Sequence, residues 1–166
     1  MPLLINQKLI CNDPWQPLTE EQPLPENGHI ILPLSRLCEE KERLNQSKLN
    51  LGVIINSDND IAQVIFELKA IKTLKLVVIV IPAFTDGRAF SFACMLRRAG
   101  FQGEIRATGD VTRDRILFLK RCGFNAFEIP EARYSPEVGK AFTEVSIYYQ
   151  GAADESKPIY RQMPKT

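Results

Sequence analysis

The sequence has 166 residues, of which 45% are hydrophobic and 25% charged, and this length predicts one globular domain rather than two. Its 21 basic and 20 acidic residues leave a formal charge of +1, which argues against a nucleic acid or a membrane surface as the partner. The longest apolar stretch, residues 76–84, is far shorter than the roughly 20 residues of a membrane-spanning helix. Because the first residues also lack the pattern of a secretory signal, we expect a cytoplasmic protein.

The cysteines and the single histidine do not form a metal-binding motif. Cys11, Cys38, Cys94 and Cys122 include no Cys-x-x-Cys pair, and His29 stands apart from them, which argues against a zinc finger or a locally encoded iron–sulfur site. We expect four small buried side chains in a reducing compartment, because free cysteine is among the most buried residue types. A four-cysteine cluster assembled in space is the less favoured alternative.

Composition divides the chain into three regions. Residues 1–28 are rich in proline and turn-forming pairs and predict an extended lead-in with room for a hairpin around residues 3–10. Residues 29–149 alternate short apolar runs with segments of helical period, which predicts a single α/β domain. Residues 150–166 lack apolar periodicity and predict a flexible C-terminal tail.

Five strands and five helices are expected in the central region. Residues 76–81 are apolar at every position, as in a central parallel strand that helices cover on both faces. The expected strands are residues 30–32, 51–55, 76–81, 104–108 and 126–129, and the expected helices are residues 35–47, 61–71, 89–99 and 116–122, with one more from Ser135 onward.

Several residues predict where these helices begin and end. Asp58 and Asp60 precede the clearest amphipathic helix and are candidates for its N-cap. Gly100 and Gly123 each follow a basic last turn and precede a phenylalanine, which predicts C-caps with positive φ. The basic residues of these turns are expected to be solvated, with a docking patch for an acidic partner as the alternative; they are Arg97, Arg98, Lys120 and Arg121.

This order of elements predicts a five-stranded, mostly parallel sheet with right-handed crossover helices. Five strands cannot close the eight-stranded barrel of a TIM fold. Two architectures remain, an open three-layer αβα sandwich, which we favour, and an incomplete TIM-like (βα) barrel.

In either architecture, functional residues gather at the carboxyl ends of the strands. Arginines beside two helix N-termini there would bind a small anion such as sulfite, sulfate, phosphate or a carboxylate. The alternative is that the aspartates cap the helices and pair with the arginines. The candidate residues are Thr85, Asp86, Gly87 and Arg88 after the third expected strand, and Gly109, Asp110, Thr112, Arg113 and Asp114 after the fourth.

Three segments carry a family resemblance: PAFTDGRAFS at residues 82–91, GEIRATGDV at 103–111 and RCGFNAFE at 121–128. They resemble the bacterial family named domain of unknown function 934, which is described as oxidoreductases of sulfite reduction. The resemblance implies a cytoplasmic protein of sulfate assimilation that acts beside or upon sulfite reductase. The candidate residues that match the family pattern are Thr85, Asp86, Gly87, Arg88, Gly109, Asp110, Arg113 and Asp114.

Two hypotheses about function follow. The first is an accessory or binding protein that holds sulfite or a related anion at the strand ends, or that docks on sulfite reductase. The second is an enzyme in which Asp86 or Asp110 carries a proton while Arg88 and Arg113 clamp a small anionic substrate. The sequence contains no recognisable flavin, sirohaem, iron–sulfur, nicotinamide or P-loop motif, which favours the first hypothesis.

Overall fold

The strands of the protein form one mixed sheet in the order β2-β1-β8-β7-β6-β5-β4-β3. The computed structural model describes residues 1–153 and 157–161. Neighbouring strands from β3 to β8 are parallel, whereas β1 pairs antiparallel with both β2 and β8. The strands are β1 (Leu3–Ile5), β2 (Lys8–Ile10), β3 (Trp15–Pro17), β4 (Asn27–Pro33), β5 (Lys48–Asn56), β6 (Leu74–Ile81), β7 (Glu104–Gly109) and β8 (Ala126–Glu128).

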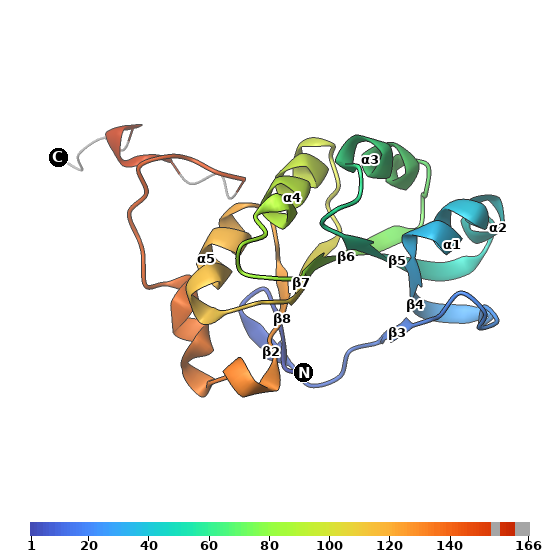
Figure 1. Cartoon of the computed structure of the whole chain (residues 1–166), viewed down its shortest axis with the longest axis horizontal. Coiled ribbons are helices and arrows are strands. Elements are labelled where there is room, and N and C mark those ends of the chain that lie inside the picture. The colour runs from blue at the N-terminus through green and yellow to red at the C-terminus, as the bar shows by residue number, and fades with distance from the viewer. Residues whose placement is uncertain (154–156, 162–166) are drawn as a thin grey trace.

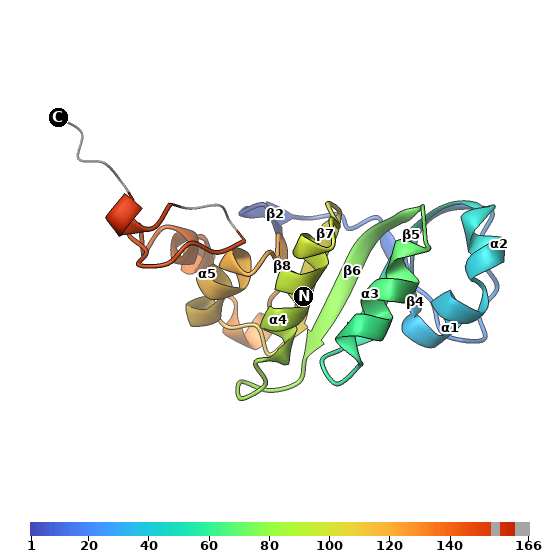
Figure 2. The same ribbon diagram turned by 90° about the horizontal axis from the view of Figure 1, so that it is seen from above.

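The sheet is curled, and the α-helices lie along its outer face (Figure 1). Figure 2 shows the same layer from above, with α3 and α4 side by side over the middle of the sheet. The helices are α1 (Leu34–Glu39), α2 (Lys41–Asn45), α3 (Ile61–Lys69), α4 (Arg88–Arg98) and α5 (Arg113–Arg121), followed by the 3₁₀ helices η1 (Glu131–Arg133), η2 (Pro136–Phe142) and η3 (Ile159–Arg161).

The α/β class expected from the sequence is confirmed, but the five-stranded open sandwich is wrong. Strands β3 to β8 join the sheet in the order of the sequence, so each right-handed crossover returns on the same face and no second helical layer arises. The hairpin expected around residues 3–10 forms as β1 and β2 and joins the sheet through β8. Together with β3, which the turn-rich composition hid, it raises the total to eight strands. The sheet is curled with helices on its outer face, and its eight strands with two antiparallel pairs also differ from the five-stranded incomplete barrel.

Two expected helices differ from those observed. The helix expected at residues 35–47 is divided into α1 and α2, because Glu40 between them leaves helical geometry with φ −95° and ψ 11°. The segment after Ser135 forms the 3₁₀ helix η2 instead of an α-helix. Of the expected flexible tail, residues 154–156 and 162–166 lie outside the described part of the chain.

Both faces of the central strand β6 are buried, as its sequence predicts. Ile79 on the outer face belongs to a large apolar cluster that includes Val64 of α3. Leu76 and Val78 on the inner face form a second cluster, against which Trp15 packs. Successive residues of a strand point to opposite faces, so one strand stabilises both layers.

No helix among the described residues combines the length and apolar character that a membrane span requires.

A buried arginine holds the inner face together. Arg106 of β7 is 1% exposed, and its guanidinium bonds to Asp13 at 2.6 Å, to Glu104 at 2.7 Å and to Glu128 at 3.1 Å. Burial raises the pKa of the Glu104 carboxyl, and the Arg106 charge opposes that rise. Asp13 lies in the linker between β2 and β3, which crosses the open side of the curled sheet (Figure 1). Arg106 therefore fixes this linker to the middle of the sheet.

The two predicted glycine caps are confirmed. Gly100 and Gly123 have φ of +93° and +113°. The next residue in each case, Phe101 or Phe124, donates its backbone N–H to the carbonyl five residues earlier, at 3.1 and 3.2 Å, which is the Schellman arrangement. Arg97 is not a solvated side chain as expected, because its guanidinium donates to backbone carbonyls of Gly123, Phe101 and Gly103 at 2.8–2.9 Å.

We predict that alanine at Gly123 destabilises the protein more than alanine at Gly100. Positive φ costs either alanine about 1 kcal/mol. At Gly123 an added Cβ would also lie 2.6 Å from Cγ of Arg97, whereas at Gly100 it would meet nothing within 4 Å. Urea unfolding of the two variants measures the difference, and equal losses of stability would contradict the prediction.

Candidate functional site

The loops that carry the candidate residues lie at one edge of the sheet. Strands β6 and β7 are parallel neighbours, and Ile81 pairs with Gly109 where both strands end. Gly109 has φ +91°, and a Cβ there would lie 2.3 Å from the carbonyl oxygen of Ile81. Asp110 donates its backbone N–H to that same oxygen at 2.8 Å. Only glycine fits this close turn, which brings the loop of Asp110 beside the loop of Asp86.

Asp86 is held by an arginine, a serine and the start of α4. Its carboxylate accepts from Nε and Nη2 of Arg88 at 3.0 and 2.8 Å, and from the backbone N–H of Arg88 at 3.0 Å. Ser57, which follows β5, donates its hydroxyl to the same carboxylate at 2.5 Å. The Arg88 guanidinium and the Ser57 hydroxyl hold the pKa of Asp86 well below its usual value. Asp86 is therefore ionised at neutral pH.

Asp110 is held by two other arginines. Arg115 of α5 donates from Nη1 to the carbonyl oxygen of Asp110 at 3.1 Å and to its carboxylate at 3.4 Å. Nη2 of Arg115 reaches the carbonyl oxygen of Asp86 at 3.5 Å. Arg133 of η1 bonds to the Asp110 carboxylate from the other side. Arg115 thus joins the two loops.

These five groups form a charged row, which we define as Arg88, Asp86, Arg115, Asp110 and Arg133. The three inner side chains are 9%, 7% and 13% exposed, whereas Arg88 and Arg133 at the two ends are 61% and 48% exposed. Three guanidinium groups against two carboxylates leave the row one positive charge in excess. The row therefore holds its negative charges inside and presents cations to solvent.

Aromatic rings enclose the middle of the row. The guanidinium of Arg115 lies 5.2 Å from the ring centre of Phe84 and 5.2 Å from that of Phe90. Cations interact favourably with aromatic faces at this distance. Phe84 itself is 66% exposed, so an apolar ring stands at the surface next to the charged row.

The other candidate residues take no part in the row. Arg113 was expected to clamp an anion together with Arg88. It forms an ion pair with Glu144 instead and pairs with neither aspartate of the row. Thr85 and Asp114 are exposed. Thr112 begins α5 without a side-chain cap, and its buried hydroxyl has no bonding partner among the described residues. Gly87 has φ −89° and open space around it, so this position does not require glycine.

Three residues of the site were not selected from the sequence. Ser57 follows β5, and Arg133 lies in η1 after the end of β8. A single serine or arginine at such a position does not by itself indicate a functional site. Arg115 lies inside a helix, three residues after its N-cap Thr112. Side chains of a helix point back toward its N-terminus, and this direction was the available signal that Arg115 would reach the strand ends.

The cysteines do not take the positions expected from the sequence. Cys11 is exposed, and Cys38, Cys94 and Cys122 are half-buried, so the expectation of four buried side chains is wrong. Cys11 lies in the linker after β2, Cys38 and Cys94 lie on α1 and α4, and Cys122 directly follows α5. In residues 1–153 and 157–161, no group of three His, Cys, Asp or Glu side chains is arranged to hold a metal ion.

Comparison with known families identifies the chain. Residues 52–160 match the family described as bacterial protein of unknown function (DUF934). The chain belongs to this family. The matched region of this DUF934 protein contains the whole charged row, whereas β1 to β4 and the linker that carries Asp13 precede it. No curated protein matches the chain.

We predict that Asp86→Asn lowers the melting temperature near neutral pH. The gap between the melting temperatures of the variant and the wild type should narrow in acid. The pKa of Asp86 is lower in the folded chain than in the unfolded chain. Ionised Asp86 therefore stabilises the fold above about pH 4, and this stabilisation is lost as the pH falls further. Thermal melts from neutral pH to about pH 2 check this. Glu21→Gln, at an exposed carboxyl, is the control, and a constant difference for Asp86→Asn would contradict the prediction.

Proposed function

We propose that this DUF934 protein is a cytoplasmic accessory protein of sulfite reduction that binds a small oxyanion at the Arg88 end of the charged row. The observation that carries the proposal is the arrangement of the row, with buried carboxylates behind exposed guanidinium groups. Asp86 fixes Arg88 through Nε and Nη2, which leaves the N–H groups of Nη1 available. A guanidinium fixed in this way loses little entropy when it binds an oxyanion.

A hollow of about 170 Å³ adjoins Arg88 and offers space for such an anion. Its walls come from the ends of β5 and β6 and include Ser57, Val80 and Pro82. Asp58 also lies in the wall, so a bound anion depends on Arg88 to offset this carboxylate. This balance makes Arg88 the residue whose removal matters most to binding.

The same geometry favours a binding protein over an acid–base enzyme. A general acid must be protonated when the reaction begins, and a general base works best with a pKa near the operating pH. The bonds from Arg88 and Ser57 lower the pKa of Asp86, so this carboxylate suits neither role. We therefore assign Asp86 the role of positioning Arg88. We choose sulfite or sulfate as the oxyanion because of the family resemblance of residues 82–128. The same resemblance is our reason for proposing sulfite reductase as the docking partner.

We predict that the wild type binds sulfite or sulfate at millimolar concentration and that Arg88→Lys weakens this binding by about 1–3 kcal/mol. Lysine keeps the charge but loses the planar fork of donors. Calorimetric titration measures the affinity, and thermal melts show whether folding is retained. Arg43→Lys is the matched control, because Arg43 is also an exposed arginine paired with a carboxylate. Absence of binding by the wild type would overturn the oxyanion site.

The place of the protein in sulfite reduction is tested in the cell. We expect a strain that lacks the protein to grow poorly on sulfate and normally on cysteine. The wild type and Arg43→Lys should restore growth on sulfate, and Arg88→Lys should not. Normal growth of the deletion strain on sulfate would refute the role in sulfite reduction.

A further inference from the structure

The opposite edge of the sheet, where the parallel strands begin, has a different distribution of charge. Away from this edge, most arginine and lysine side chains pair with a carboxylate within 4.0 Å. In the described chain these are Arg36, Lys41, Arg43, Arg88, Arg106, Arg113, Arg115, Arg133 and Lys140.

Several cations at the opposite edge have no such partner among the described residues, and four of them lie near the ends of α3 and α4. Lys69 and Arg98 lie in the last turns of α3 and α4. Lys72 lies just before β6, and Lys75 is the second residue of that strand. All four are exposed. The helix dipole accounts for cations in the last turns, but it does not account for Lys72 and Lys75. Glu67, the nearest acidic residue along α3, bonds to Lys41 instead.

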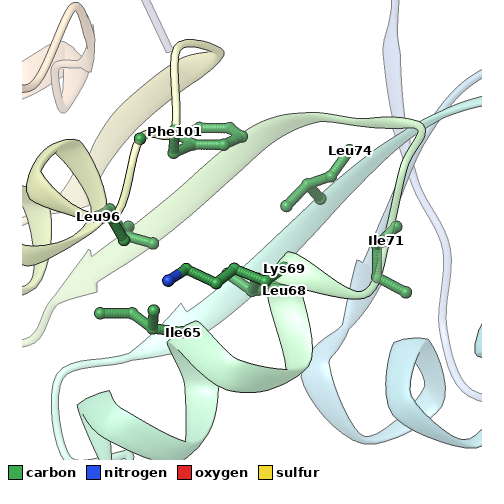
Figure 3. Close-up of a pocket in the computed structure, with 9 residues that line it drawn as sticks. Ile65, Leu68, Lys69, Ile71, Leu74, Leu96 and Phe101 are labelled. Atoms are coloured by element: carbon green, nitrogen blue, oxygen red, sulfur yellow. The ribbon is translucent and has the colours of Figure 1, made fainter.

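Lys69 lines an apolar hollow of about 190 Å³ between α3 and α4. The other three cations, Lys72, Lys75 and Arg98, are each next in sequence to one of its lining residues, Ile71, Leu74 and Ala99. Figure 3 shows Lys69 extending from α3 across this hollow in the direction of Leu96 on α4. The hollow is large enough for one aliphatic or aromatic side chain. Its apolar walls come from Ile65, Leu68, Ile71, Leu74, Leu96 and Phe101.

The rim of the hollow is held in place by bonds from the neighbouring helix. Asn45 of α2 accepts the backbone N–H of Lys72 at 3.0 Å and donates to the carbonyl oxygen of Ala70 at 2.9 Å. The Schellman cap at Gly100 fixes the other side. A preformed hollow with a charged rim binds at a smaller cost in entropy than a mobile one.

We propose that this edge is a docking surface for an acidic segment of a partner protein, which inserts one apolar side chain into the hollow. Interfaces of this kind combine a buried apolar anchor with a polar rim, and complementary charge speeds and orients the encounter. A membrane surface fits less well because it would need apolar groups that protrude. A nucleic acid fits less well because its phosphate backbone supplies no apolar anchor. The surface lies at the edge opposite the charged row and is independent of the oxyanion proposal.

The test uses two labelled peptides of glutamate and aspartate, one with a central phenylalanine and one with serine in its place. We expect the phenylalanine peptide to bind in fluorescence anisotropy, with an affinity that falls as salt is added. The serine peptide should bind about fivefold more weakly. The double variant Lys72→Glu with Lys75→Glu should lose about tenfold or more in affinity. Lys140→Glu, which reverses an exposed lysine on η2, should leave the affinity unchanged.

Two further measurements decide between this proposal and its rivals. Amide shifts in NMR spectra of the peptide complex should cluster on the ends of α3 and α4, and shifts at the β6–α4 loop instead would overturn the proposal. Equal affinity for the two peptides, or tighter binding to duplex DNA or to phosphatidylserine vesicles, would also overturn it. Sulfite titration of the double variant should match the wild type, so a failure here leaves the oxyanion proposal intact.

Discussion

The order in which the parallel strands join the sheet determines most of this structure. Each strand from β3 to β8 lies next to the one before it in sequence, and right-handed crossovers then place every connecting helix on the same face. One face of the sheet is covered by helices as a result, and the inner face needs another cover. The linker between β2 and β3 crosses this face, and Trp15 at the start of β3 packs on the inner cluster, so both supply part of that cover.

The inner face shows how a buried charge can fix a long connection. Arg106 lies at the middle of the sheet, and the only way to bury its guanidinium at low cost is to pair it. Glu104 and Glu128 come from the same sheet, but Asp13 comes from a residue 93 positions away in sequence. Removal of Arg106 would leave these carboxylates facing one another, so the arginine links the N-terminal strands to the region shared with the DUF934 family.

The same strand order separates two kinds of surface. All parallel strands end at one edge, where Arg88, Arg115 and Arg133 meet the two aspartates in a paired, largely internal row. They begin at the other edge, where Lys69 lines an apolar hollow and Lys72 and Lys75 directly follow two of its lining residues, Ile71 and Leu74. A net charge of +1 conceals this difference between the two edges, because it sums charges over the whole chain. An accessory protein with one edge for an anion and another for a partner is consistent with both proposals.

Local signals in the sequence determined the α/β class, the glycine caps at Gly100 and Gly123, and the approach of Asp86 and Asp110, because each depends on residues close in the chain or on neighbouring strands. Tertiary structure decided the rest. The joining of the N-terminal hairpin to the rest of the sheet depends on pairing between β1 and β8, which are more than 120 residues apart. The partners of Arg113, Arg115 and Arg133 depend on which side chains the folded loops bring within bonding distance. Such contacts between distant residues leave no periodic pattern in the sequence, and so only the folded chain shows them.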